Sequence, residues 1–275
     1  MKVAVSGVKG GVGKSTFSVL LALKLAKEKK KVMLCDLDVE CPNDYLLLNQ
    51  KLENPEEIYT YLPKLKEEKC KKCGLCSKVC KENAIFWVPD KYPIFIYDLC
   101  NGCGACWITC PNKAIGKEKV KIGEMFMNKV NENLILITGK SVPLFSETGI
   151  VVKEIMERVL EMKEKLGVEE IIVDTAPGAH CNLIQVLVRV DKVYAVTEPT
   201  PLGAYDLRVM LEVAKKLGIE VEVVLNKANV GDKKEIEKIV KEFGKEIILE
   251  IPFSSRVIDA YCSGKLEEVL DLIWK

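Results

Sequence analysis

The chain has 275 residues, 41 of them basic and 40 acidic, which gives a formal net charge of +1. Because the charge is balanced, the sequence predicts no broad basic field and disfavours extended nucleic-acid binding. No run of about 18 apolar residues occurs, so neither a membrane span nor a signal peptide is predicted. We therefore expect a cytoplasmic protein, in which most of the 12 cysteines are metal ligands rather than disulfide partners.

Apolar segments of strand type alternate with amphipathic helical segments over most of the chain. The expected strands cover residues 3–6, 31–36, 134–138, 170–174, 193–198, 221–226 and 246–252, and the expected helices cover 15–29, 147–166, 207–217 and 234–243. This order is typical of an α/β fold, with a parallel sheet that has helices on both faces. The segment from about Pro42 to Asn131 breaks the alternation, and only short strands are expected in it. We expect a main domain of residues 1–58 and 121–275 and a small inserted domain of residues 59–120.

The segment KGGVGKST, which begins at Lys9, joins the first expected strand to the first expected helix. Its glycines let backbone N–H groups approach a phosphate, and the N-terminus of the helix adds positive potential. In such a phosphate loop, Lys14 binds the β- and γ-phosphates of ATP, and the Ser15 hydroxyl binds Mg²⁺. The strict Walker A pattern fails at its first position, where Val8 stands in place of glycine. The other candidate nucleotide-binding residues of the loop are Gly10, Gly11, Val12, Gly13 and Thr16.

Acidic residues follow two of the apolar strands. Asp36 and Asp38 lie in CDLDVECPN, and Asp174 lies in IIVDTAPG. Carboxylates at strand ends meet the ligand crevice of an open parallel sheet, where they hold Mg²⁺ or orient an attacking water. Asp38 and Asp174 are therefore the expected Mg²⁺ ligands beside Ser15, and Asp38 is also a candidate catalytic residue. For Asp36 a role as a turn residue stays open, because acidic side chains also favour turns.

Eight cysteines form two runs of identical spacing, C-x2-C-x2-C-x3-C, which begin at Cys70 and Cys100. Three closely spaced thiolates bind one face of a [4Fe–4S] cluster, and the fourth ligand comes from the other run. The predicted ligands are Cys70, Cys73, Cys76 and Cys110 for one cluster and Cys80, Cys100, Cys103 and Cys106 for the other. Zinc is the alternative, but zinc favours separated C-x2-C pairs and does not need triplets.

Four cysteines lie outside these runs. Cys35 is inside an expected strand and is predicted to be a small core residue, and Cys262 has no expected partner. Cys41 and Cys181 each follow one of the acidic strand ends, and for both the favoured interpretation is structural.

The loop KGGVGKST resembles the deviant Walker A of the MinD/ParA/Mrp/nitrogenase-iron-protein family. The resemblance implies a P-loop NTPase fold of the SIMIBI type and a dimer that sandwiches nucleotide, in which Lys9 reaches the partner's ATP as a catalytic residue. CDLDVECPN and IIVDTAPG then correspond to the family's switch I and switch II regions. Asn226 matches the asparagine that contacts the base, and Pro252 and Phe253 lie where the family's last loop covers it.

The cysteine runs resemble those of bacterial two-cluster ferredoxins, although Lys81 follows Cys80 where those proteins usually have proline. Nearly the whole chain resembles the MinD-superfamily ATPases with an inserted ferredoxin domain. This resemblance implies an ATPase in which ATP-dependent dimer switching gates electron transfer through the clusters, or assists metallocluster assembly on a client. It also implies a homodimer or a heterodimer with a related ATPase, together with a redox partner or a client protein.

Two other functions stay open. A positioning ATPase of the cell-division kind anchors through a basic amphipathic C-terminal helix. The tail GKLEEVLDLIWK has more acidic residues than lysines, and so predicts a closing core helix instead. The other alternative is a ferredoxin-type electron carrier with a regulatory nucleotide site. A reduced-cluster spectrum that changes with ATP would distinguish gated transfer from this simple carrier.

Overall fold

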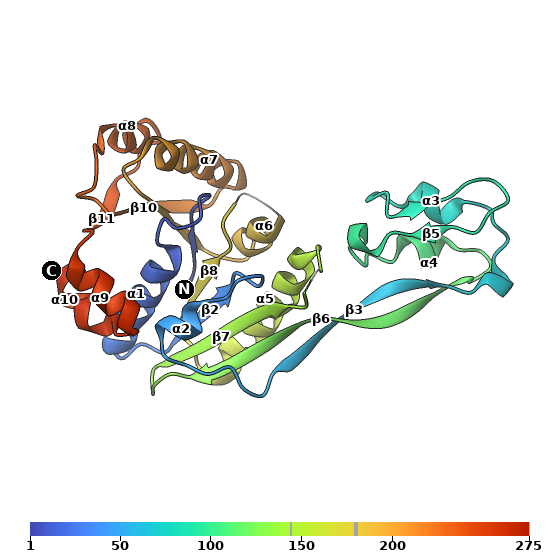
Figure 1. Ribbon diagram of the computed structural model, residues 1–275, viewed down its shortest axis with the longest axis horizontal. Coiled ribbons are helices and arrows are strands. Elements are labelled where there is room, and N and C mark those ends of the chain that lie inside the picture. Colours follow the sequence, from blue (N-terminus) through green and yellow to red (C-terminus); the bar gives the residue numbers. More distant parts are fainter. Residues whose placement is uncertain (144, 179–180, 275) are drawn as a thin grey trace.

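The computed structural model describes residues 1–143, 145–178 and 181–274. Within these residues, nine strands form one sheet, and its seven strands from β11 to β7 run parallel (Figure 1). The last two strands, β6 and β3, continue the sheet in antiparallel pairing. In their order across the sheet, the strands are β11 (Ile247–Ile251), β10 (Glu220–Asn226), β9 (Lys192–Thr197), β1 (Lys2–Ser6), β8 (Glu170–Thr175), β2 (Val32–Leu37), β7 (Leu134–Ser141), β6 (Ile115–Lys129) and β3 (Glu56–Leu65).

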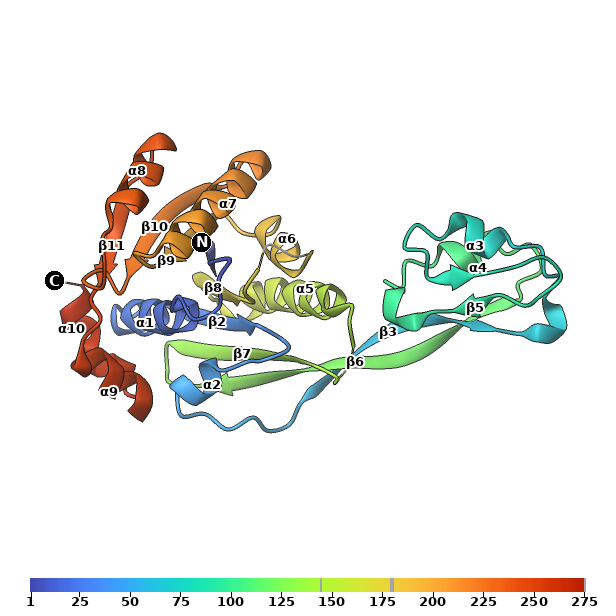
Figure 2. The same ribbon diagram turned by 45° about the horizontal axis from the view of Figure 1, so that its top comes forward.

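Helices cover both faces of the sheet, because successive residues of each central strand point to opposite faces. Along β2, Met33 and Cys35 join one buried apolar cluster, whereas Val32 and Leu34 join another. One face is covered by α5 (Thr148–Leu166), α6 (Cys181–Leu187), α7 (Pro201–Leu217) and α8 (Lys234–Glu242) (Figures 1 and 2). The other is covered by α1 (Lys14–Lys27), α2 (Asp44–Leu47), α9 (Ser255–Ser263), the 3-10 turn η3 (Leu266–Val269) and α10 (Leu270–Ile273). The predicted α/β fold is thus confirmed, with two antiparallel strands at one edge.

Two expectations about helices are wrong. The helix expected over residues 207–217 begins earlier, at Pro201, because the Thr200 hydroxyl accepts a hydrogen bond from the Gly203 backbone N–H. Proline suits the first helical turn, so the helix can begin at Pro201. The tail is also not one helix, since η3 and α10 follow separately after α9. Its apolar side chains nevertheless join the core, as expected. No helix within the described ranges is long and apolar enough to cross a membrane.

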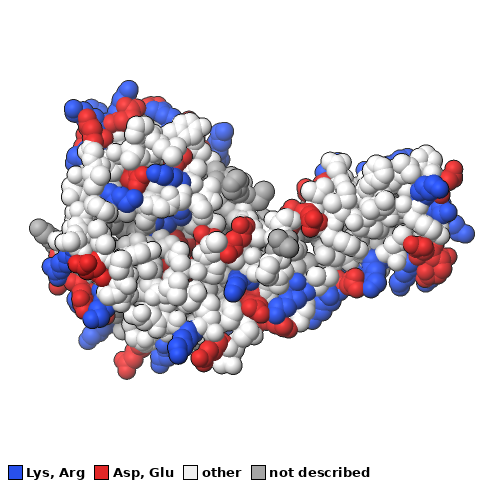
Figure 3. Space-filling model, in the orientation of Figure 1, with Lys and Arg blue, Asp and Glu red and all other residues white. Residues whose placement is uncertain are grey.

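The two edge strands extend far beyond the sheet. Strand β6 pairs with β7 only over Gly123–Lys129, and its first half pairs with β3 alone. The result is a two-stranded arm that carries a small module away from the main domain (Figures 1 and 2). The expectation of only short strands between Pro42 and Asn131 is therefore wrong, because β3 and β6 run unbroken through the expected boundaries at residues 58/59 and 120/121. Acidic and basic side chains are interspersed over the main domain and the arm (Figure 3).

The module at the end of the arm has a very small apolar core. It contains η1 (Glu67–Lys69), α3 (Leu75–Val79), β4 (Ile85–Phe86), β5 (Ile94–Phe95), η2 (Tyr97–Leu99) and α4 (Ala105–Thr109). Its buried apolar cluster consists of only four residues, Cys76, Ile85, Cys106 and Ile115. A core of this size is too small to stabilise a separate fold, and small domains of this kind usually need metals or disulfides.

The arm leaves the sheet at a β-bulge. Ile58 pairs with Gly123 and Tyr59 pairs with Lys121, so Ile122 is the extra residue. The Ile122 side chain is fully buried in the main core. A Cβ atom on Gly123 would lie 2.8 Å from the Lys140 carbonyl oxygen and 2.9 Å from Cγ1 of Val151 on α5. Bulges bend a strand and increase its twist. The bulge at Ile122, packed at the base of the arm, therefore sets the direction of the arm.

Gly123→Ala is expected to lower the free energy of unfolding by about 1–3 kcal/mol, because the new methyl group overfills the base of the arm. Urea denaturation followed by circular dichroism measures the loss. Gly116→Ala, in the arm half of the same strand, is the matched control. Its Cβ would first meet the flexible end of the Lys66 side chain, at 3.3 Å, so we expect little change. Equal losses in the two variants would contradict this account of Gly123.

Candidate functional site

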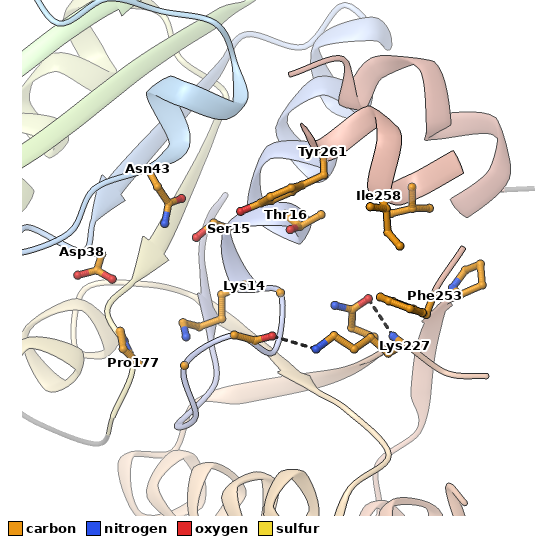
Figure 4. Close-up of a pocket in the computed structure, with 16 residues that line it drawn as sticks. Lys14, Ser15, Thr16, Asp38, Asn43, Pro177, Lys227, Phe253, Ile258 and Tyr261 are labelled. Carbon is orange, nitrogen blue, oxygen red and sulfur yellow. Dashed lines mark hydrogen bonds between the residues drawn. The ribbon is translucent and has the colours of Figure 1, made fainter. Parts of the chain in front are cut away.

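A pocket of about 380 Å³ opens at the carboxyl ends of the central strands (Figure 4). The loop after β1 forms one end, which is polar and includes Lys14, Ser15 and Thr16. The other end is formed by residues after β10 and β11 and by α9, which contribute Phe253 and Tyr261. Phosphate donors at one end and apolar and aromatic side chains at the other give this pocket the polarity of a nucleotide site.

The phosphate loop is held in place by Asn226. The Asn226 Nδ2 donates a hydrogen bond of 2.8 Å to the Val12 carbonyl oxygen. Gly13, at the start of α1, has a φ of 97°, and a Cβ there would lie 2.1 Å from Asn226 Nδ2. Only glycine fits this position. Asn226 and Pro252 both line the pocket. The Val12 side chain is buried in the core, so Val12 offers the site its backbone alone.

Lys14 is a nearly buried cation at the phosphate end of the pocket. Its side chain is 6% exposed, and its Nζ donates to the Lys9 carbonyl oxygen at 3.2 Å. Burial lowers the pKa of Lys14, and the carboxylates of Asp174 and Asp38 offset part of this effect. A bound phosphate would place a negative charge beside Lys14 and so stabilise its protonated, positively charged form.

Lys9 is held outside this pocket by Glu198, which the sequence analysis missed. Lys9 Nζ lies 2.6 Å from Glu198 Oε1, and Lys227 Nζ lies 2.8 Å from Oε2 of the same carboxylate. Although burial alone would raise it, hydrogen bonds from Lys227 and Lys9 lower the pKa of Glu198. Its position at the end of β9 is the same signal that indicated the other carboxylates, and it could have been found in this way.

The predicted metal ligands lie at the mouth of the pocket and beneath it. Ser15 Oγ donates to Asp174 Oδ2 at 2.6 Å, and Asp174 is nearly fully buried. Asp38 lines the pocket, and burial raises its pKa. Asp36 accepts backbone hydrogen bonds from Asn43 at 2.8 Å and from Asp44 at 3.0 Å. Asp36 therefore organises the turn that follows β2, whereas Asp38 faces the pocket and Asp174 lies against Ser15.

Asp44 is a buried carboxylate that the sequence analysis also missed. It is fully buried, and neither of its carboxylate oxygens has a hydrogen-bond partner among the described residues. Ligand atoms of Asp36, Asp44 and Asp174 lie within 4.8 Å of one another. Burial, together with charge repulsion, raises the pKa of Asp36 to about 8 and that of Asp44 well above its usual range. The pKa of Asp174 rises to about 6, chiefly through burial. The local sequence of Asp44 predicts an ordinary helix start, so no signal pointed to it.

Each predicted set of cluster ligands lies around its own small pocket in the module. One pocket is lined by Cys70, Cys73, Cys76 and Cys110, and the other by Cys80, Cys100, Cys103 and Cys106. Backbone N–H groups already point at the sulfurs: Ala84 N lies 3.3 Å from Cys80 Sγ, and Ala114 N lies 3.3 Å from Cys110 Sγ. Four converging sulfurs with backbone donors fit a [4Fe–4S] cluster.

The cysteine pockets are also poorly suited to free thiolates. Burial raises the pKa of Cys76 and Cys100, and raises that of Cys106 to about 11. These thiols therefore stay protonated until a metal replaces the proton. Among the other cysteines, Cys35 is in the core, whereas Cys41 and Cys262 are exposed. The Cys181 side chain lies outside the described residues, so its expected structural role is not tested.

Asp44→Asn is expected to stabilise the nucleotide-free protein at high pH. When folding raises the pKa of an acid, the folded state binds more protons than the unfolded state, and stability falls as the pH rises between the two pKa values. For Asp36 these values are 3.8 and about 8. Removing the Asp44 charge relieves this loss. We expect a gain of about 1 kcal/mol or more at pH 8, equivalent to about one pKa unit, and little gain at pH 5. Urea denaturation at both pH values measures it. The exposed variant Asp259→Asn is the control, and a gain independent of pH would contradict the electrostatic origin.

The chain is similar to one family model and to several known proteins. The family model described as CobQ/CobB/MinD/ParA nucleotide binding domain matches residues 3–267. The uncharacterized protein MJ0579 of Methanocaldococcus jannaschii is 39% identical over 266 residues, which are 96% of this chain and 90% of that protein. Ketoisovalerate oxidoreductase subunit VorD of Pyrococcus furiosus is 43% identical over 93 residues, which are 34% of this chain and 88% of that subunit.

A solved structure agrees with the family match. A chain of the MinC:MinD cell division protein complex of Aquifex aeolicus aligns with a TM-score of 0.59, over 98% of this chain and 88% of that chain. At 19% identity this likeness shows the fold alone. The family match over residues 3–267 covers the phosphate loop, both switch regions and the pocket. The chain therefore belongs to the CobQ/CobB/MinD/ParA family of P-loop nucleotide-binding domains.

Proposed function

We propose that this protein is an ATPase in which nucleotide-dependent dimer switching gates electron transfer through two [4Fe–4S] clusters, or assists the assembly of a metallocluster on a client. The observation that carries the proposal is the combination of sites in one sheet. The nucleotide pocket lies at the ends of its central strands, and the two four-cysteine pockets lie on an arm formed by its edge strands.

In this proposal, each predicted residue of the nucleotide site has a role. Lys14 and the backbone of Gly10–Thr16 bind the phosphates, and Asn226 and Pro252 contact the base. Ser15, Asp38 and Asp174 hold Mg²⁺, which when bound neutralises charge on the β- and γ-phosphates. Asp38 is partly exposed and lines the pocket, whereas Asp174 is buried, so Asp38 is the carboxylate that orients the attacking water.

The ion pair of Lys9 supports a dimeric active state. In this chain Lys9 is bound to Glu198 rather than directed into its own pocket. A catalytic role across a dimer interface requires Lys9 to leave Glu198 and reach the partner's ATP. A single chain is then a slow ATPase, because one positive charge is missing from its transition state. The partner is a second copy or a related ATPase of the same family.

The module supports a redox or metallocluster role over a positioning role. A positioning ATPase has no use for eight thiols grouped in a separate module, whereas bound [4Fe–4S] clusters supply one-electron transfer. The apolar side chains of the tail, among them Leu266, Leu270 and Ile273, are buried in the core and are not free to bind a membrane surface. The similarity to VorD, which is named as a subunit of an oxidoreductase, favours a redox partner.

Anaerobically purified protein is expected to contain about eight iron and eight sulfide ions per chain, the content of two [4Fe–4S] clusters. Cys110→Ala should remove the cluster that Cys70, Cys73 and Cys76 bind and leave the other, so the iron content should fall by about half. Iron and sulfide assays with EPR spectroscopy measure this. Cys262→Ala, an exposed cysteine outside the module, is the matched control. Stoichiometric zinc without acid-labile sulfide would rule out this assignment.

A non-hydrolysable ATP analogue with Mg²⁺ is expected to change the EPR line shape or midpoint potential of the clusters in the intact protein. Lys14→Ala should abolish the response, because productive phosphate binding is lost. The Lys9→Ala variant should bind nucleotide with the affinity of the wild-type monomer, but it should neither hydrolyse ATP nor dimerise when ATP is added. Equilibrium binding, phosphate release and light scattering measure these steps.

The surface variant Lys27→Ala is the matched control for both lysines, since its side chain is 57% exposed and away from the pocket. Equal loss of nucleotide affinity in the Lys9 and Lys14 variants would contradict a role for Lys9 across an interface. Clusters that ignore nucleotide in the presence of bound analogue would contradict gating, and the module would then be a simple electron carrier.

A further inference from the structure

The segment that enters α5, residues 145–148, contacts switch I, the helix that follows switch II, and the cysteine module. We propose that this entry segment transmits the nucleotide state to one cluster, the one bound by Cys80, Cys100, Cys103 and Cys106, and leaves the other cluster unaffected. The inference rests on the proposed gating function and specifies its route.

The contact with the module is a hydrogen bond next to a cluster ligand. Ser146 Oγ donates to the Asp98 carbonyl oxygen at 2.6 Å. Asp98 lies in η2, and the Cys100 backbone N–H donates to the Tyr97 carbonyl oxygen at 3.0 Å, so the turn ends directly at the ligand. Outside the arm, the Ser146–Asp98 bond is the one hydrogen bond in the described part of the chain that joins the main domain to the module.

The contacts with the nucleotide site are made by Thr148, which is 4% exposed at the first turn of α5. Thr148 Oγ1 donates to Glu40 Oε1 at 3.1 Å, and Glu40 is two residues beyond Asp38 in switch I. The Asn182 Nδ2 donates to the same Thr148 oxygen at 2.8 Å, from the helix that follows switch II. The entry segment therefore receives one contact from switch I and one from the helix that follows switch II, both at Thr148, two residues from Ser146.

The arm places the Cys100 cluster nearer to the main domain than the Cys70 cluster. Pro63 of β3 lines the pocket of the Cys100 cluster, whereas Leu65, farther along the same strand, lines the pocket of the Cys70 cluster. Strands rise about 3.3 Å per residue, so the two pockets are offset along the arm. Gly102 is also close to the arm, since a Cβ there would lie 3.1 Å from Thr60 Oγ1. The proximal cluster is thus the one that the entry segment reaches.

These contacts define a two-state element. ATP and Mg²⁺ draw Asp38 toward the γ-phosphate, Glu40 moves with the switch, and the first turn of α5 shifts with Thr148. Ser146 then moves the turn at Asp98, which changes the backbone donors and solvent around Cys100. The potential of an iron–sulfur cluster depends on these two properties. Ser146 and Thr148 are positioning residues, because neither touches nucleotide or cluster.

Hydrogen exchange measured by mass spectrometry on the intact, cluster-loaded protein tests the route. With a non-hydrolysable ATP analogue and Mg²⁺, amide exchange in residues 97–103 should change by about 5-fold or more, the lower end of ordinary coupling. Exchange in residues 70–76 should stay the same. In redox titrations followed by EPR, only one of the two clusters should shift its midpoint potential. Equal responses of both segments would overturn the inference, because the arm would then transmit the change as a whole.

Ser146→Ala should bind the analogue normally and lose the response of residues 97–103, and Ser146→Thr, which keeps a hydroxyl, should retain it. Tyr97→Phe is the matched control, because it removes the 3.1 Å hydrogen bond from Tyr97 to Pro63 in the same turn and leaves Ser146 in place. A full response in Ser146→Ala overturns the proposed route while gating stands. A wild-type protein that binds the analogue without any change in either cluster overturns the proposed function itself.

Discussion

The structure depends on the pairing of β2 with two strands from later in the chain. On one side β2 pairs with β8, which brings Asp36 beside Asp174, and on the other it pairs with β7, which brings Asp36 beside Thr138. The first pairing closes the nucleotide site. The second connects that site to β6 and β3, and so to the arm and the cysteines. A continuous ladder of backbone hydrogen bonds thus joins the strands that carry the two sites.

The same pairing concentrates negative charge beneath the phosphate loop. Asp36, Asp44 and Asp174 are all nearly fully buried, and burial raises the pKa of each. Charged groups of one sign at this distance are costly in a dry site unless a cation or a proton compensates them. The fold accepts this cost where Mg²⁺ and Lys14 are expected to meet a phosphate. Protons bound by Asp36 and Asp44 offset part of this cost, because the raised pKa of each carboxyl group favours its neutral form.

The module is weakly stabilised for a different reason, because its buried apolar core is very small. Its buried cluster includes Cys76 and Cys106, whose thiols contribute little packing of their own. Metal–sulfur bonds would supply the stability that this core lacks, and folding of the module would then depend on the bound metal. The arm keeps this module outside the main core, and the contact of Ser146 with Asp98 joins it to the nucleotide domain a second time. The module is therefore joined to the main domain by the two strands of the arm and by one further hydrogen bond.

Local patterns in the sequence were sufficient for several features. The alternation of strands and helices follows from periodicity within each segment, so the α/β fold was predictable. The phosphate loop and the two cysteine runs are spaced within a few residues, and the structure brings each predicted ligand set together around one pocket. Strand-end position alone indicated Asp38 and Asp174.

Other features were decided only by contacts between distant segments. Strands β3 and β6 are rich in lysine and glutamate, and their extension of the sheet depends on β7, which no local pattern specifies. Glu198 acquires its role from Lys9 and Lys227, which lie elsewhere along the chain. Asp44 acquires its role from Asp36, which lies on another element. The Ser146–Asp98 bond spans 48 residues. The sequence by itself therefore determined the candidate phosphate-binding and cluster-binding groups, because residues a few positions apart have a local geometry that their spacing fixes. The tertiary structure decided which groups oppose one another and which site can affect the other, because burial and long-range pairing are properties of the whole fold.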